Sequence, residues 1–284
     1  MLKISYLGPA NTNTHLAALK RFKGMGKLEH APTVEDVFHA VETEESDYGV
    51  IPIENSLEGA VTHTLDRFVQ FKQTPARIVG EIELPIRHCL ITLQRTPRDK
   101  VKIIYSHPQA LAQCQYWLDK NFLDATRRET RSTAEAIEDV LAKDGIWNRY
   151  ERAAIGSPEL AKQHKLKAIP IPVNRDNRTR FLIISSTRRA KRGKHNKTSL
   201  MFALKDKPGA LHDALIPFKN CGINLTKIES RPTKRRAWEY VFFVDIEGHE
   251  SDKSVKRALK ILERCVSRLL VLGSYPIGGQ RGRG

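Results

Sequence analysis

Short apolar strands alternate with helical patterns over the first 186 residues, and this alternation limits the fold more than any other feature of the sequence. Apolar runs at residues 3–7, 48–53 and 101–105 are each followed by a polar turn and then by a helical pattern. A helix after each strand returns the chain, so that the next strand can join the same sheet. We therefore predict an α/β fold for this part of the chain.

Polar side chains gather at the ends of these apolar runs. They occupy residues 12–14, 54–56 and 106–109. In open α/β sheets ligands bind at the carboxyl ends of the strands, so these three groups are candidates for one binding site. Thr12 and Thr14 have an alternative role, because hydroxyl groups at such positions also cap a following helix.

A fourth polar stretch, residues 172–180, leads directly into an apolar run at residues 181–184. Guanidinium, amide and hydroxyl groups are crowded in it, which suits a small anionic ligand held by a loop on a rigid strand. A solvated loop before a strand explains the same composition equally well. This stretch alone therefore leaves both interpretations open.

The α/β region is long enough to form two lobes. From length and alternation we assign residues 1–77 and 161–186, approximately, to lobe one and residues 78–160 to lobe two. A cleft between two lobes is a favoured site for a small molecule.

The pattern of strands and helices restarts after residue 197. Residues 198–276 follow the order βαββαβ, which predicts a ferredoxin-like second domain. Residues 187–197 are rich in charge and poor in apolar side chains, so we predict a basic, solvated linker between the domains. Residues 277–284 are rich in Gly and Arg, which predicts a disordered tail.

The composition argues against a membrane protein or a secreted one. No apolar run approaches the roughly 18 residues that cross a bilayer, and the first residues enter a strand pattern without a signal-peptide profile. Cys89, Cys114, Cys221 and Cys265 are scattered without a CxxC pair, so we expect neither a disulfide framework nor a structural metal. We therefore expect a cytoplasmic protein.

The net charge of +16 raises the question of nucleic-acid binding. One dense basic run lies at residues 188–197, and no zinc finger, helix-turn-helix or aromatic RNA-binding motif accompanies it. We favour a basic solvated surface that attracts acidic metabolites over a nucleic-acid partner.

Five short motifs give the sequence a family resemblance. Each is a weak pattern alone, but all five in this order are specific, and they lie at residues 49–59, 106–110, 179–181, 207–211 and 228–232. With these motifs the chain resembles the prephenate dehydratases that carry a C-terminal ACT regulatory domain, over nearly its whole length. The resemblance implies a two-lobed, periplasmic-binding-protein-like catalytic domain over residues 1–186, followed by a ferredoxin-like ACT domain.

The resemblance also implies an activity, the conversion of prephenate to phenylpyruvate with loss of water and carbon dioxide in L-phenylalanine biosynthesis. It implies no cofactor and no metal. By motif matching, the catalytic residues are Thr179, Asn55 and Ser56. By the same matching, the substrate-binding residues are Thr12, Thr14, Glu54, Ser106, His107, Gln109, Arg180 and Phe181.

The residue types suit this reaction. The ring hydroxyl of prephenate is a poor leaving group, so a positioned donor such as the Thr179 hydroxyl assists its departure. Arg180 suits bidentate binding of a substrate carboxylate, with a surface ion pair as its alternative role. His107 is equally compatible with a direct role and with a structural one.

The first family motif usually reads Gly-Pro-x-Gly-Thr-(Phe/Tyr)-Ser, and this chain departs from it. Asn11 replaces a glycine, Asn13 an aromatic residue and Thr14 a serine. Asn tolerates a left-handed backbone, so the turn survives the first change. The lost aromatic side chain leaves arogenate open as an alternative substrate. A non-catalytic two-lobed protein that binds small anions and senses amino acids is a second alternative.

In the ACT domain the resemblance implies feedback regulation by L-phenylalanine, bound at a dimer interface. The effector-binding residues by motif matching are Pro208, Gly209, Ala210, Leu211, Asn224, Glu229, Ser230, Arg231 and Pro232. His212 stands where the family has valine, so inhibition by phenylalanine is less firmly implied than the catalytic activity. We expect a homodimer or a homotetramer.

Overall fold

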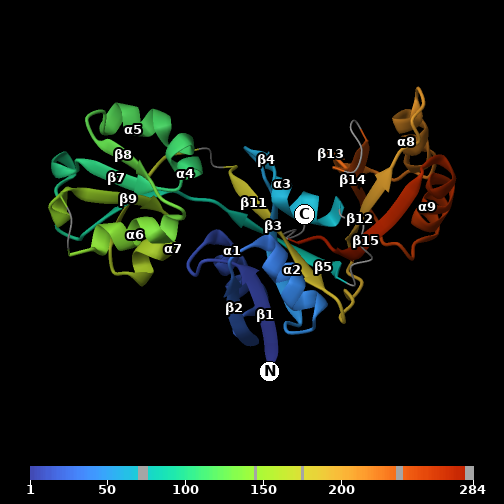
Figure 1. The fold of residues 1–284 in the computed structure, drawn as a ribbon, viewed down its shortest axis with the longest axis horizontal. Coiled ribbons are helices and arrows are strands. Elements are labelled where there is room, and N and C mark those ends of the chain that lie inside the picture. The colour runs from blue at the N-terminus through green and yellow to red at the C-terminus, as the bar shows by residue number, and fades with distance from the viewer. Residues whose placement is uncertain (70–75, 144–145, 174–175, 235–238, 279–284) are drawn as a thin grey trace. The chain divides into compact units, whose positions relative to one another are not determined.

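The computed structural model describes residues 1–69, 76–143, 146–173, 176–234 and 239–278. Strands and helices alternate up to residue 185, and a second strand–helix pattern follows (Figure 1). The α/β class, the two-lobed catalytic region and the ferredoxin-like order of the last part are confirmed.

The helices and strands have the following bounds in the described residues. The strands are β1 Leu2–Leu7, β2 Gly26–Ala31, β3 Tyr48–Asn55, β4 Gly59–Ala60, β5 Arg77–Pro85, β6 Cys89–Thr92, β7 Ile103–Ser106, β8 Thr126–Glu129, β9 Arg152–Gly156, β10 Lys167–Pro170, β11 Arg178–Ser185, β12 Asn196–Ala203, β13 Leu225–Pro232, β14 Tyr240–Glu247 and β15 Arg268–Pro276. The α-helices are α1 Asn13–Phe22, α2 Val34–Glu42, α3 Thr62–Val69, α4 Pro108–Gln113, α5 Gln115–Asn121, α6 Thr133–Leu141, α7 Pro158–Gln163, α8 Ala210–Asn220 and α9 Lys253–Cys265. Short 3₁₀ helices are η1 Arg98–Lys100 and η2 Arg149–Glu151.

The first sheet has the order β2-β1-β3-β11-β5, and the short strand β4 pairs with the end of β3. β1 runs parallel to both of its neighbours. Thr33 caps α2 and forms a capping box with Asp36, as the sequence of this helix indicates. Phe38 and Val41 of α2 are fully buried in the core that covers this sheet.

The second sheet has the order β10-β6-β9-β7-β8. Leu90 and Ile104 belong to one hydrophobic core, while their neighbours Ile91 and Ile103 belong to another. Successive residues of a strand point to opposite faces, so helices cover this sheet on both sides.

The third sheet has the order β13-β14-β12-β15 and is antiparallel throughout. Val244 and Ile246 of β14 pack in the core that includes residues of α8 and α9, which lie together on one face (Figure 1). Val241 and Phe243 of the same strand belong instead to the core of the first sheet, where Phe243 meets Phe68 of α3. The ferredoxin-like domain and the first sheet therefore share one hydrophobic core.

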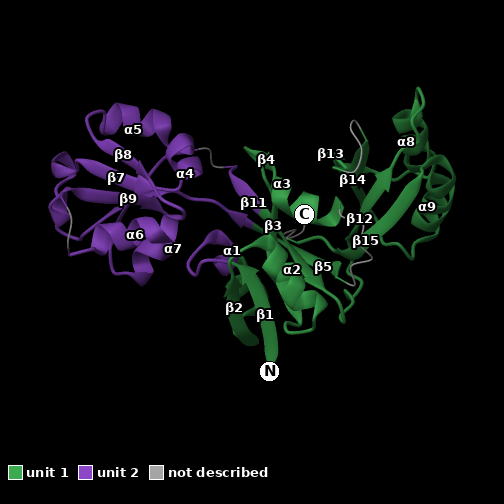
Figure 2. Ribbon diagram, viewed as in Figure 1, with its two compact units in different colours: residues 1–7, 17–83, 180–284 green, residues 8–16, 84–179 purple. Residues whose placement is uncertain are grey.

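The chain divides into two compact units, coloured in Figure 2. Unit 1 comprises residues 1–7, 17–83 and 180–284, and unit 2 comprises residues 8–16 and 84–179. The units differ from the predicted lobe limits at residues 8–16 and 78–83, and most of all at residues 161–179, which lie in unit 2. Strand β10 explains the last difference, since it pairs with β6 inside the second sheet.

The predicted linker also needs correction. Asn196 and Lys197 are buried and begin β12, so the linker ends earlier than residue 197. Its basic side chains are partly engaged, because Arg188 pairs with Asp47 at 3.2 Å and Arg192 pairs with Asp252. The run is therefore bound to the residue before β3 and to the N-terminus of α9.

The predicted disordered tail falls mostly outside the described residues. At its start, the backbone N–H of Gly278 donates to Glu81 Oε1 at 3.1 Å, so this residue is bound. Within the described part of the chain, no helix is long and apolar enough to cross a bilayer.

Candidate active site

The end of β3 carries the first predicted group, Glu54, Asn55 and Ser56. Asn55 is buried, and its side-chain oxygen accepts hydrogen bonds from the backbone N–H groups of Leu57 (3.0 Å) and Glu58 (3.3 Å). In such an Asx turn the side chain shapes the loop that follows it. The carboxamide oxygen of Asn55 and the loop that carries Ser56 are thus fixed together.

Arg180 of β11 lies in a cluster of buried charges, with only 8% of its side chain exposed. Its Nη2 pairs with Asp245 Oδ2 of β14 (2.6 Å), and its Nη1 pairs with Glu54 Oε1 (3.0 Å). Its Nε lies 3.6 Å from Glu81 Oε2 of β5. The structure does not support the predicted clamp on a substrate carboxylate, because the guanidinium faces protein carboxylates. The Glu54 carboxylate likewise faces charged groups of the protein, the cations of Arg180 and Lys227.

We call this group the charged cluster. Its members are Glu54, Glu81, Arg180, Lys197, Lys227 and Asp245. Lys197 Nζ lies 3.0 and 2.9 Å from the two carboxylate oxygens of Glu81, and Lys227 pairs with the second oxygen of Glu54. Three cations balance three carboxylates, so the cluster is neutral overall. Neutral pairing offsets the large cost of removing each charge from water.

Hydroxyl groups complete the charged cluster. Ser199 Oγ donates to Asp245 and lies 2.6 Å from the hydroxyl of Tyr275, which is fully buried. Burial raises the pKa of Tyr275 well above its ordinary value, and the Asp245 carboxylate adds to the rise. Burial alone lowers the pKa of Arg180, but Asp245 and the other carboxylates outweigh it and raise that pKa overall. Arg180 therefore stays charged at any ordinary pH.

Phe181 follows Arg180 in β11 and is 1% exposed. The structure places its ring in the protein core, so the ring has almost no surface for the predicted substrate contact. Burial of this ring anchors the strand that carries Thr179 and Arg180.

Thr179 is half-buried at the start of β11, and the chain before it is held firmly. Asn177 is fully buried, its Nδ2 donates to Gln113 Oε1 (2.9 Å), and its backbone oxygen accepts from the N–H of Ile86 (2.8 Å). His88 Nε2 lies 2.7 Å from the same Gln113 oxygen and donates to it. We call His88, Gln113 and Asn177 the neutral network.

Thr12 and Thr14 lie at the start of α1. The Thr12 hydroxyl donates to Pro9 O (3.0 Å) and accepts from the N–H of His15 (3.4 Å), so the capping alternative describes its contacts. Asn11 has a left-handed φ of 68°, and its N–H donates to His15 Nδ1 (3.0 Å). Burial lowers the pKa of His15, which favours the neutral ring that this bond requires. Thr14 is buried.

Ser106 ends β7 and is fully buried, and its hydroxyl donates to the backbone oxygen of Ile155 in β9 (2.9 Å). This bond ties two strands together, so the structure favours a structural role over the predicted substrate contact. His107 caps α4, where its Nδ1 accepts from the N–H of Gln109 (3.3 Å). A neutral ring that accepts at Nδ1 carries its proton on Nε2, from which it can donate to a ligand.

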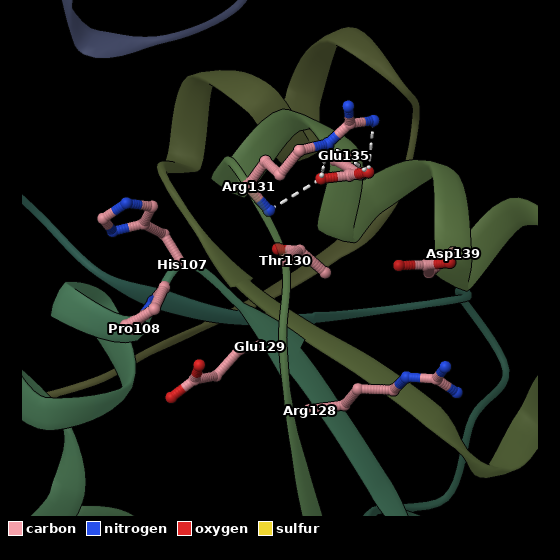
Figure 3. A pocket seen from close by; sticks show the side chains of 8 residues that line it. All are labelled: His107, Pro108, Arg128, Glu129, Thr130, Arg131, Glu135 and Asp139. Carbon is pink, nitrogen blue, oxygen red and sulfur yellow. Dashed lines mark hydrogen bonds and ion pairs between the residues drawn. The ribbon is translucent and has the colours of Figure 1, made fainter.

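A hollow beside His107 is shown in Figure 3. It is lined by His107, Pro108, Arg128, Glu129, Thr130, Arg131, Glu135 and Asp139. Arg131 binds Glu135 through its guanidinium and its backbone N–H, and burial raises the pKa of Asp139. Two basic side chains face three carboxylates in this lining, so the hollow does not attract a dianion.

The loop before α8 carries the first predicted effector segment. Gly209, Ala210 and Leu211 line a cavity of about 890 Å³ with Tyr240 and Phe242 of β14. Gly209 has a φ of 76° at the N-cap, a left-handed conformation that favours glycine. The first N–H groups of a helix and its positive dipole end suit a carboxylate.

The second predicted effector segment lies on β13, at the edge of the third sheet. Ser230 and Pro232 pair with the two β14 residues that line the cavity. Asn224 and Glu229 are not among the described residues that line it. The strand register thus brings part of this segment beside the cavity.

Arg231 binds the catalytic region and not the cavity. Its Nε and Nη2 lie 3.1 and 2.9 Å from Asp66 Oδ1 of α3, and Lys234 Nζ lies 2.7 Å from Asp66 Oδ2. Burial tends to raise the pKa of Asp66, but the bonds from Lys234 and Arg231 lower it overall. The structure therefore does not support Arg231 as an effector contact within one chain.

The partners that hold Arg180, Glu81 and Asn177 in place are not evident from the sequence. Glu81 and Asp245 each interrupt an apolar strand, and this interruption is the available sequence signal. Their partners cannot be identified from spacing, because Asp245 lies 65 positions from Arg180 and Lys197 lies 116 from Glu81. Lys197 looks like one more cation of the basic run, and Gln113 carries no signal beyond its helix.

The first two sheets with their helices, together with the βαββαβ domain, define a class of protein, the periplasmic-binding-protein-like enzymes that carry an ACT domain. The family description "Prephenate dehydratase" matches residues 4–189, and "ACT domain" matches residues 198–264. The chain belongs to the prephenate dehydratase family and is an enzyme of the dehydratase class. The non-catalytic alternative is therefore set aside.

Individual relatives agree with this assignment. A bifunctional chorismate mutase/prephenate dehydratase of Aquifex aeolicus is 45% identical over 97% of this chain and 74% of that protein. A prephenate dehydratase of Methanocaldococcus jannaschii is 38% identical over 96% of this chain and 98% of that protein. A crystal structure of prephenate dehydratase from Arthrobacter aurescens in complex with L-Phe has a TM-score of 0.86 at 33% identity, over 97% of this chain and 90% of that one.

Proposed function

We propose that this enzyme converts prephenate to phenylpyruvate with loss of water and carbon dioxide, in L-phenylalanine biosynthesis and in the cytoplasm. Thr179 donates a hydrogen bond to the departing ring hydroxyl, and Asn55 and Ser56 orient the substrate. The remaining proposed substrate contacts are Thr12, Thr14, His107 and Gln109. Glu54, Ser106, Arg180 and Phe181 act in the framework that supports these residues.

The observation that carries this proposal is the position of Thr179 between two anchored neighbours. Asn177 is bound to Gln113 at 2.9 Å, and Arg180 is bound to Asp245 at 2.6 Å. Thr179 itself is half-buried, so a ligand can reach it. A donor that is fixed before the reaction stabilises developing charge without the cost of reorganisation.

The reaction needs a placed donor more than a nucleophile. The bond between the ring and its carboxylate breaks, carbon dioxide leaves, and the electron pair moves into the ring. The C–O bond at the opposite ring carbon then breaks, the ring becomes aromatic, and the departing hydroxide takes up a proton to form water. A threonine hydroxyl is a weak acid, so it stabilises the departing oxygen by hydrogen bonding while water completes the proton transfer.

Turnover of prephenate by the purified protein, followed by phenylpyruvate absorbance, tests the proposal. Thr179→Val is expected to lower kcat by about 10²–10⁴-fold, because it removes the donor and keeps the shape. Thr179→Ser keeps the hydroxyl and is expected to retain most of the activity. No product from the wild-type enzyme would refute the activity, and near-normal turnover by Thr179→Val would exclude Thr179.

Asn13 in place of an aromatic residue keeps arogenate as the alternative substrate. An assay that supplies prephenate and arogenate together at equal concentration decides which of the two is the preferred substrate. We expect phenylpyruvate to form faster than phenylalanine, and the reverse order would assign the enzyme to arogenate.

We propose L-phenylalanine as the effector, with its carboxylate at the N-terminus of α8. Within one chain, the cavity residues Gly209, Ala210 and Leu211 support this position, together with the adjacent Pro208. The residues of the second segment, Asn224, Glu229, Ser230 and Pro232, belong to the proposed contact between two copies in a homodimer or homotetramer. Light scattering measures the oligomeric state directly.

His212 lines the same cavity, with 78% of its side chain exposed. We expect His212→Val to bind phenylalanine more tightly than the wild-type enzyme, because valine adds apolar contact without a polar ring. Calorimetric titration of both proteins measures the difference, and weaker binding by the variant would contradict this placement.

A further inference from the structure

We propose that Lys227 and Asp245 of the ACT domain are positioning residues for the dehydration. Through the charged cluster they hold β3 and β11 where Asn55 and Thr179 are attached. This inference rests on the catalytic roles proposed above for those two residues.

The contacts lead directly from the ACT domain to the catalytic strands. Asp245 of β14 binds Arg180, which follows Thr179 in the chain, at 2.6 Å. Lys227 of β13 pairs with Glu54, which precedes Asn55. Each ACT residue is thus separated from a proposed catalytic residue by one side chain and one peptide bond.

On the side of β4, the end of β3 is held by few backbone hydrogen bonds. There it pairs with β4, a strand of two residues, through Glu54 opposite Ala60 and Asn55 opposite Gly59. The carboxylate of Glu54 binds cations from two domains, Arg180 and Lys227. The side chains of Lys227 and Asp245 are 12% and 6% exposed, so water screens these ion pairs weakly.

The two domains pack against each other without the help of the charged cluster. Met201 and Phe243 of the ACT sheet already share a hydrophobic core with Phe38 and Phe68 of the catalytic region. Buried ion pairs add little net stability compared with apolar residues of the same size. Their directional bonds fix geometry, which an apolar contact does less well, so positioning explains the cluster better than adhesion.

The Asx turn of Asn55 offers a reporter that does not depend on turnover. Its side-chain oxygen accepts from the N–H groups of Leu57 and Glu58, so hydrogen exchange of these two amides reports whether Asn55 stays in place. The test variants are Lys227→Met and Asp245→Asn. Arg192→Met is the matched control, because it removes an ion pair between the linker and Asp252 of the ACT domain that lies outside the cluster.

We expect the amides of Leu57 and Glu58 to exchange at least about fivefold faster in Lys227→Met, while those of α9 keep the wild-type rate. For both test variants we expect kcat to fall about 10- to 100-fold with KM within about threefold, because small misplacement of reacting groups costs rate more than binding. Lys227→Arg restores the charge and is expected to recover most of the loss. Arg192→Met is expected to match the wild-type enzyme in both measurements.

Unchanged exchange at Leu57 and Glu58 in folded Lys227→Met would overturn the inference. If the amides of α9 exchanged faster by the same factor, the inference would also be overturned, because the variant would then have lost stability throughout the protein. A wild-type enzyme that forms no phenylpyruvate refutes the proposed function instead, while the exchange rates still decide whether Lys227 positions Asn55.

Discussion

Two regions hold the chain on either side of Thr179, and they do so by different physics. Asn177, two residues before it, is held by the neutral network through hydrogen bonds with no charge. Arg180, directly after it, is held by the charged cluster, in which three cations and three carboxylates are buried together. The neutral network lies wholly in unit 2, whereas the charged cluster lies wholly in unit 1 and includes ACT residues.

The two regions differ in how they respond to the loss of one member. A hydrogen-bonded amide network fixes a position, and the loss of one bond lowers the free energy of unfolding only modestly, because it leaves one polar group unsatisfied. A buried cluster of charges is stable only when complete, because removal of one member leaves an uncompensated charge. Sensitivity to change in the ACT domain is therefore expected on the Arg180 side of Thr179 and not on the Asn177 side.

The largest effect is expected from breaking the charged cluster at Glu81, whose side chain is fully buried. Glu81→Met leaves Lys197 without its carboxylate, and we expect the free energy of unfolding to fall by about 3–5 kcal/mol. Glu81→Met/Lys197→Met keeps the remaining four charges balanced and is expected to recover more than half of that loss. Urea unfolding measures both, and equal losses in the single and double variants would contradict the neutrality argument.

A smaller effect is expected from breaking the neutral network. Gln113→Leu removes the oxygen that binds both Asn177 and His88, and we expect a loss of about 2–3 kcal/mol in the free energy of unfolding. We also expect kcat to fall about tenfold, because the segment before Thr179 loosens.

Gln94→Leu is the matched control for this variant, since Gln94 is exposed and its side-chain amide donates to the backbone oxygen of Lys165 at 2.9 Å. Its expected loss is below about 0.5 kcal/mol. If Gln94→Leu and Gln113→Leu are equally stable, the neutral network is not an anchor.

Mild acid is expected to lower the stability of the protein through His15 of unit 2, which lies outside the neutral network and the charged cluster. Burial lowers the pKa of His15 in the folded protein, so below the unfolded value of about 6.5 the unfolded chain binds more protons. Stability from the neutral ring is therefore complete above that pH and is lost as pH falls, by at most about 1.4 kcal/mol per pH unit. Arg180 stays charged throughout.

Unfolding at pH 7.5, 6.5 and 5.5, with His15→Asn as the reference variant, isolates this contribution. We expect the wild-type protein to lose more stability than the variant between the last two values. Parallel profiles for the two proteins would mean that His15 does not titrate with unfolding.

The smallest effect is expected at Ser106, which ties β7 to β9 in unit 2. Ser106→Ala is expected to cost about 1 kcal/mol of stability, the usual value of one hydrogen bond. KM and kcat should stay within about twofold if Ser106 acts only in the sheet. A large rise in KM would restore the substrate contact that the sequence predicts.

Much of the architecture can be predicted from the sequence. The strands that the sequence does not indicate share one property, their position in the sheet. Strands β2, β8 and β10 lack a clear apolar run in the sequence, and each lies at the edge of its sheet. An edge strand pairs on one side only and tolerates polar side chains, so sequences such as Thr126–Glu129 carry no apolar run. The helical segment that follows β7 is interrupted at Cys114, where α4 gives way to α5.

The sequence by itself determined the α/β class, the ferredoxin-like order and the family, because hydrophobic periodicity and ordered motifs are local properties of the chain. It also singled out Asn55 and Thr179 as candidates. The fold places Arg180 against Asp245 and Glu54, and Glu54 against Lys227, pairings that no spacing in the sequence indicates. The physical reason is that the partner of a buried charge is chosen by distance in space, and the fold brings together residues that no sequence spacing relates.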